Sequence, residues 1–127
     1  MKYIFLQCLV AMILNVTCST SVLADAKDDA ARHLASKSGC FVCHAIEPGA
    51  PGLDGKLPVG PAWKAVAARY KGDASAARKL TTAVMGGTSP YIRHWKDETS
   101  GNAMPPNSVT LSEADAAKLV TWILGLR

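Results

Sequence analysis

Five consecutive residues, Cys40 to His44, indicate the function of this chain more specifically than any other stretch. Two cysteines separated by two residues and followed directly by histidine form the pattern of c-type haem attachment. Residues three apart on one helical turn point the same way, so both thiols can reach the two vinyl groups on one edge of a porphyrin. Each thiol would form a thioether, and His44 can coordinate the iron as the proximal ligand. The motif predicts one covalently bound haem c.

Two other uses of such a cysteine pair are less well supported. A zinc site needs two further ligands with their own spacing. Beyond residue 24 the chain has no other cysteine, and His33 and His94 stand singly. A redox dithiol of the thioredoxin type needs a βαβ context, and no run of the sequence is typical of a strand. Zinc binding and dithiol or disulfide chemistry remain alternatives to haem attachment.

Met104 is the candidate for the second axial ligand of the iron. A thioether is a soft ligand, and Met/His ligation raises the reduction potential of a haem. Pro105 restricts Met104 to extended backbone, and neither Pro105 nor Pro106 offers an N–H group. Such a stiff, extended segment suits the task of holding one weak ligand against a metal. The alternatives to Met104 are Met85, His33 and His94.

The first 24 residues have the features of an export signal. Lys2 supplies a positive start, residues 3–16 are mostly apolar, and Val22-Leu23-Ala24 fits a cleavage site. The apolar part is shorter than the roughly 20 residues that a membrane-spanning helix needs. We expect a cleaved signal peptide at residues 1–24, a soluble haem domain at residues 25–127, no membrane insertion after cleavage, and a periplasmic location. An uncleaved anchor is the alternative.

Charge and cysteine content limit the kinds of partner. The formal net charge is +4 for the whole chain and becomes +3 without residues 1–24, which contain one lysine and no acid. Two haem propionates would bring this charge close to neutral. No basic run interleaved with aromatic residues indicates nucleic-acid binding. Both cysteines of the exported part belong to the haem motif, so no disulfide framework is expected, and we expect a monomer.

Helical patterns and breakers organise the first half of the haem domain. Residues 25–38 are predicted to form a helix that ends at Gly39. The proline and glycine content of residues 45–59 predicts a loop. Gly60-Pro61 then opens a second helix, with Pro61 at the first helical position.

The second half has two more predicted helices. Asp73 is placed to cap a helix over residues 74–85, which Gly86-Gly87 ends. Residues 88–110 are predicted to be irregular. Ser112 and Asp115 resemble a capping box at the start of the last helix, which has apolar residues at helical spacing.

Three motifs give the chain a resemblance to the small bacterial class I cytochromes c. They are Cys40 to His44, Gly60-Pro61-Ala62-Trp63, and Met104-Pro105-Pro106-Asn107 ahead of the last helix. They come in the order of that family, and the resemblance covers residues 25–127. It implies an all-α fold of four to five helices around one haem, with the first and last helices packed across each other. The loop at 45–59 looks longer than in the shortest members of the family.

The resemblance also implies roles for individual residues. The Pro61 carbonyl would accept a hydrogen bond from the second ring nitrogen of His44, which fixes the tautomer of the ligand. Asn107 would form a hydrogen bond near the sulfur of Met104. Trp95 would donate its indole N–H to a haem propionate.

Together the motifs predict an electron carrier without catalytic residues. The iron would be held by His44 and Met104 and would cycle between its ferrous and ferric forms. The partners would be redox proteins, an electron donor and an electron acceptor, met through transient interfaces. The alternatives are a cytochrome subunit or electron-donating partner of a periplasmic dehydrogenase or oxidase complex and, with less support, a haem peroxidase or a gas sensor.

Overall fold

The computed structural model describes residues 19–52, 55–92 and 94–127, and within them the chain is helical with no strand. This confirms the predicted all-α class. The chain forms two compact units, residues 1–30 and 31–127. The described elements are α2 (Ser19–Lys37), the short 3-10 helix η1 (Cys40–Val42), α3 (Trp63–Arg69), α4 (Ala76–Gly86) and α5 (Glu113–Leu124).

The first unit contains the start of α2. Residues 1–18 of the expected signal peptide lie outside the described residues, and α2 is already helical at Ser19, upstream of the predicted start at Asp25. No helix in the described part of the chain is long and apolar enough to cross a membrane. The helix ends at Lys37, and Gly39 follows with a left-handed φ of 74°. Gly39 therefore ends the helix as predicted, because a left-handed residue just beyond a helix is most easily glycine.

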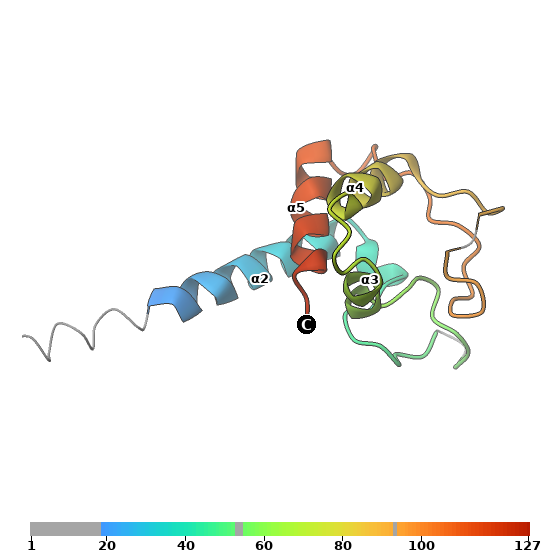
Figure 1. Ribbon diagram of the computed structural model, residues 1–127, viewed down its shortest axis with the longest axis horizontal. Coiled ribbons are helices and arrows are strands. Elements are labelled where there is room, and N and C mark those ends of the chain that lie inside the picture. The colour runs from blue at the N-terminus through green and yellow to red at the C-terminus, as the bar shows by residue number, and fades with distance from the viewer. Residues whose placement is uncertain (1–18, 53–54, 93) are drawn as a thin grey trace, which may run out of the picture. The chain divides into compact units, whose positions relative to one another are not determined.

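The core of the second unit is built from the last turns of α2 together with α3 and α5. Arg32 on α2 also lies over the Trp122 ring of α5, with its guanidinium carbon 5.9 Å from the ring centroid. The first and last helices therefore share one core, as the resemblance implies. Both α3 and α4 contact α5 (Figure 1). The buried residues of this core are Ala35, Trp63, Val66, Leu111, Ala116, Leu119 and Ile123.

Leu119 tests this packing because it is only 4% exposed. Replacing Leu119 by alanine is expected to lower the free energy of unfolding by about 2–5 kcal/mol, since a buried leucine leaves a cavity when it is truncated. Denaturant unfolding measures this loss. Thr121→Ala, at an exposed position of the same helix, is the matched control and should change stability by about 0.5 kcal/mol or less. Equal, small losses in both variants would contradict the packing described for α5.

The start of α3 differs from the prediction. Pro61 is not the first helical residue; α3 begins at Trp63, and Ala62 before it is extended, with φ −62° and ψ 138°. The first backbone N–H groups of a helix need partners outside it. Here the Trp63 N–H donates to the Ala45 carbonyl (2.9 Å) and the next N–H donates to the Ile46 carbonyl (3.1 Å). The preceding loop thus caps α3, and Pro61 stays outside the helix.

The start of α4 also lies later than predicted, at Ala76 instead of Ala74. The Asp73 carboxylate accepts hydrogen bonds from the backbone N–H and the hydroxyl of Ser75, and lies 3.0 Å from the Lys79 ammonium. It therefore caps a turn that precedes the helix. These contacts, those with Ser75 first, lower the pKa of Asp73 from 3.8 to about 2. Because folding lowers this pKa, their stabilising effect is present above pH 3.8 and is lost as the pH falls through about 2.

The described parts of the two predicted irregular stretches, 45–59 and 88–110, contain no helix or strand. They are joined to each other: the backbone N–H of Ser100 donates to the Pro58 carbonyl (2.8 Å), and the N–H of Gly101 donates to the Val59 carbonyl (3.0 Å). At the far end of the second stretch, the hydroxyl of Ser112 accepts a hydrogen bond from the Asp115 N–H at 3.2 Å. This confirms the predicted cap of α5.

Candidate functional site

The cysteine–histidine motif lies on η1 and the turn that follows it. The backbone N–H groups of Cys43 and His44 both donate to the Cys40 carbonyl, at 3.3 and 3.1 Å. Both cysteines are free thiols and partly buried. Burial is the main cause that raises the pKa of the Cys40 thiol, with a smaller contribution from Cys43, and a backbone hydrogen bond opposes it. The turn therefore places two thiols that are not joined in a disulfide beside one imidazole.

The imidazole of His44 is oriented by Pro61. Its Nδ1 lies 2.8 Å from the Pro61 carbonyl oxygen. A carbonyl can only accept, so Nδ1 is the donor and the lone pair is left on Nε2. Burial lowers the pKa of His44, and the hydrogen bond to Pro61 opposes this in part. Burial favours the neutral imidazole, which is the form that binds a metal.

Gly60 and Trp63 confine the same imidazole. A Cβ atom on Gly60 would lie 2.7 Å from Cε1 of His44, so the backbone approaches the ring as closely as a glycine permits. The ring of Trp63 lies nearly parallel to that of His44, at an angle of 21° with 5.8 Å between centroids. Both residues belong to one of the three motifs in the sequence, but neither was predicted to orient His44. Their position next to Pro61 was the signal that could have indicated one.

Gly60→Ala is expected to displace the His44 ring. The added methyl group overpacks the site, and we expect a loss of about 1–3 kcal/mol in the free energy of unfolding together with a changed haem absorption spectrum. Gly86→Ala is the matched control, because a Cβ there meets no atom within 4 Å. Thermal unfolding and absorption spectra of both variants measure the difference. A Gly60 variant that matches the Gly86 variant would contradict the close contact.

Met104 lies in the irregular stretch after α4, on a segment held by Asn107. The backbone N–H of Asn107 donates to the Val84 carbonyl (3.1 Å), and its side-chain amide donates to the carbonyls of Val84 (3.0 Å) and Pro105 (2.8 Å). The amide therefore binds two backbone carbonyls. A hydrogen bond near the sulfur of Met104, which the resemblance implies, stays a prediction. In this structure Asn107 holds the backbone that follows Met104 to α4, through the carbonyls of Pro105 and Val84.

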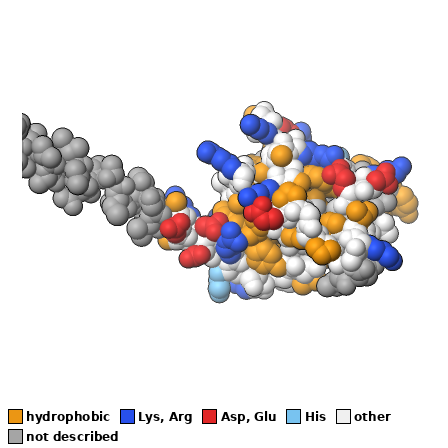
Figure 2. Space-filling view, turned by 90° about the horizontal axis from the view of Figure 1, so that it is seen from below, with side chains coloured by type: hydrophobic (Ala, Val, Ile, Leu, Met, Phe, Trp, Pro, Cys, Tyr) orange, Lys and Arg blue, Asp and Glu red, His pale blue; other side chains and the backbone are white. Residues whose placement is uncertain are grey.

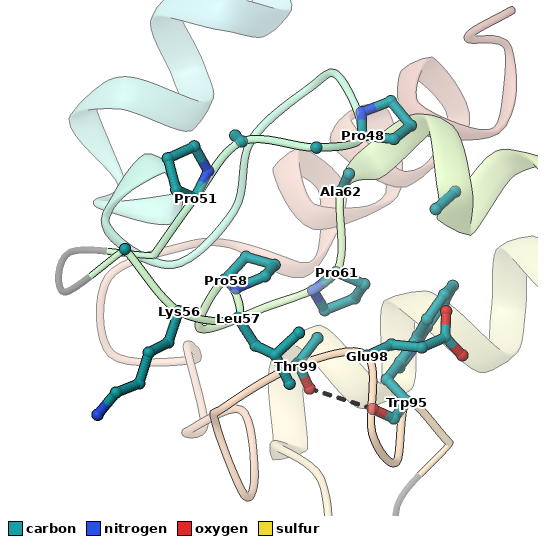
Figure 3. A pocket seen from close by; sticks show the side chains of 14 residues that line it. Pro48, Pro51, Lys56, Leu57, Pro58, Pro61, Ala62, Trp95, Glu98 and Thr99 are labelled. Carbon is teal, nitrogen blue, oxygen red and sulfur yellow. Dashed lines mark hydrogen bonds between the residues drawn. The ribbon is translucent and has the colours of Figure 1, made fainter.

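Trp95 lines a cavity of about 460 Å³ between the two loops and α3 (Figure 3). Pro61 lines the same cavity, although the two residues are far apart in the sequence. The guanidinium of Arg69 lies over the Trp95 ring, 4.0 Å from its centroid, and forms an ion pair of 3.3 Å with Glu98. Arg69 also donates to the His94 carbonyl. These contacts of Arg69 were not predicted, because no local pattern in the sequence indicates that Arg69 packs on Trp95.

The described contacts form two groups, one around His44 with Pro61 and one around the Met104 segment with Asn107. Among residues 19–52, 55–92 and 94–127, no group of three or more His, Cys, Asp or Glu side chains is placed to hold a metal ion. The donor groups fit a covalently attached haem. They are two thiols, an imidazole with an available Nε2, and the thioether of Met104 on a segment held by hydrogen bonds.

Comparison with known proteins decides the family. The family model for cytochrome c matches residues 29–127. The chain belongs to the cytochrome c family. It is 42% identical to cytochrome c-551 of Allochromatium vinosum over 111 residues, which cover 87% of this chain and 95% of that protein.

Solved structures agree with this assignment. The crystal structure of wild-type Nitrosomonas europaea cytochrome c552 matches with a TM-score of 0.58 and 39% identity, covering 76% of this chain and 99% of that one. Class 1 cytochrome MtoD from Sideroxydans lithotrophicus ES-1 matches with a TM-score of 0.52 and 34% identity, covering 77% and 94% of the two chains. These relatives confirm a small bacterial class I cytochrome with one covalent haem c. They also confirm that it transfers electrons to and from redox partners and is not an enzyme.

Proposed function

We propose that this cytochrome carries its haem on thioether bonds from Cys40 and Cys43, with the iron between His44 and Met104. The observation that carries this assignment is the hydrogen bond of 2.8 Å from His44 Nδ1 to the Pro61 carbonyl, directly after the paired thiols. It leaves Nε2 as the ligating atom. The bound haem would supply an iron that takes up and releases one electron.

The remaining site residues would support these ligands. Pro61 would hold His44 in one tautomer and make the imidazole a stronger ligand. Asn107 would keep the segment that carries Met104 against α4, and a hydrogen bond near the sulfur stays a prediction. Trp95 would donate its indole N–H to a haem propionate. Arg69 packs on its ring, at the cavity that Pro61 also lines.

The mature protein would be a periplasmic monomer that meets its redox partners transiently. The expected signal segment at residues 1–24 supports export. Figure 2 shows basic and acidic side chains interspersed with apolar ones on one face of residues 31–127, with no broad area of a single charge. Transient contacts between redox proteins use small interfaces. Exposed lysines such as Lys56 and Lys96 would add electrostatic steering.

Exposure of the reduced protein to carbon monoxide tests the carrier function. A carrier with both axial positions filled should show little spectral change at neutral pH and should cycle reversibly between its oxidised and reduced spectra. Peroxide turnover by the oxidised protein should stay negligible. Rapid carbon monoxide binding, or peroxide turnover at an enzyme-like rate, would contradict the proposal and favour a sensor or a peroxidase.

A further inference from the structure

One residue, Thr88, binds both polar backbone atoms of Met104. The Met104 N–H donates to the Thr88 hydroxyl at 2.8 Å, and the Thr88 N–H donates to the Met104 carbonyl at 2.9 Å. The two residues lie 16 positions apart in the chain. This reciprocal pair of hydrogen bonds fixes the backbone of Met104 against Thr88, the second residue after the end of α4.

The hydrogen bonds of Met104 to Thr88 matter because the next two residues cannot donate a backbone hydrogen bond. Pro105 and Pro106 have no N–H group, so the Met104 N–H is the last backbone donor before Asn107. The segment also lies directly against Gly87, which has a φ of 76° and where a Cβ would be 2.9 Å from both the Met104 carbonyl oxygen and the Pro106 nitrogen. The Met104 segment is therefore held at its start by Thr88, in its middle by contact with Gly87, and at its end by Asn107 on Val84.

We propose that Thr88 is a positioning residue for the axial methionine. Its hydroxyl holds the Met104 backbone where the thioether stays on the iron, and loss of the hydroxyl lets other ligands replace the sulfur more easily. The inference rests on the proposed role of Met104 as a ligand. Thr88 is exposed, so a substitution there disturbs the segment without opening a cavity in the core.

Thr88→Val tests the proposal, because it keeps the β-branched shape and the backbone N–H but removes the acceptor. The oxidised holoprotein is titrated to alkaline pH while the weak near-infrared band of methionine-ligated ferric haem is followed. A typical hydrogen bond corresponds to roughly a threefold to tenfold change in the population of displaced methionine. The pH at which half of the band is lost should therefore fall by about 0.5–1 unit. Thr88→Ser, which restores the hydroxyl, should behave as the wild type.

Thr121→Val makes the same chemical change at an exposed position of α5 and should leave the midpoint unchanged. If Thr88→Val yields no holoprotein, Thr88→Ala is titrated with the same expectation. An unchanged midpoint in the Thr88 variants, with a normal band in the wild type, would overturn the role of Thr88 alone. Absence of the band in the wild type would overturn the ligation by Met104 and this inference together.

Discussion

The double variant Cys40→Ser/Cys43→Ser is expected to carry no covalently attached haem. Both thiols lie beside His44 on one short turn, and a serine hydroxyl does not add to a vinyl group as a thiol does. The mass of the denatured protein should equal that of the polypeptide alone. Haem staining after denaturing electrophoresis should be negative, although the wild type stains strongly.

Loss of the haem should also lower stability severely. The buried apolar residues of the described chain are few, and several are alanines, so the haem would supply much of the apolar mass of the domain. A group that binds the native state alone stabilises it. Val42→Ala, at the 73% exposed position between the two cysteines, is the control and should retain haem and fold. A haem-sized mass increase in the double variant would contradict attachment at these thiols.

Met104→Ala is expected to lower the reduction potential by tenths of a volt, within the roughly 0.8 V range over which axial ligands set haem potentials. Removal of the thioether withdraws the ligand that favours the reduced iron. The near-infrared band should disappear, and carbon monoxide and cyanide should bind readily. Potentiometric titration and ligand-binding spectra measure these changes.

Met85→Leu is the matched control for this variant. Met85 is partly buried near the end of α4 and packs against the core, where a change of similar volume is tolerated. It should keep the wild-type potential and the near-infrared band. A Met104 variant with an unchanged potential would show that another residue ligates the iron. Loss of the band in the Met85 variant instead would assign that role to Met85.

Local signals in the sequence predicted where α2 and α4 end and where α5 begins. Gly39 and Gly87 have left-handed φ values after α2 and α4, and Ser112 caps α5. Each of these features depends on one residue and its immediate neighbours, which periodicity and propensity describe well. The start of α3 was predicted wrongly because a distant contact overrides the local preference. Pro61 suits a first helical position, but its carbonyl faces His44, and the loop before it supplies the cap.

The supporting contacts of the site could not be predicted in the same way. Arg69 on Trp95 and Thr88 on Met104 join segments that are distant in the chain, and no spacing within either segment indicates its partner. The candidate ligands could be predicted from the sequence, because each lies in a short contiguous motif of residues with a known chemistry. What the three-dimensional structure adds is the set of residues that orient them.

An optical spectrum of the protein, produced in cells that attach haem c, shows whether the haem is bound and whether methionine ligates it. The oxidised form is recorded into the near infrared, and the reduced form is recorded in the visible range. We expect sharp α and β bands on reduction and a weak near-infrared band on oxidation, because these are the signatures of covalent haem bound by His44 and Met104. Haem bands without the near-infrared band would contradict methionine ligation, and the absence of any haem spectrum would contradict the function itself.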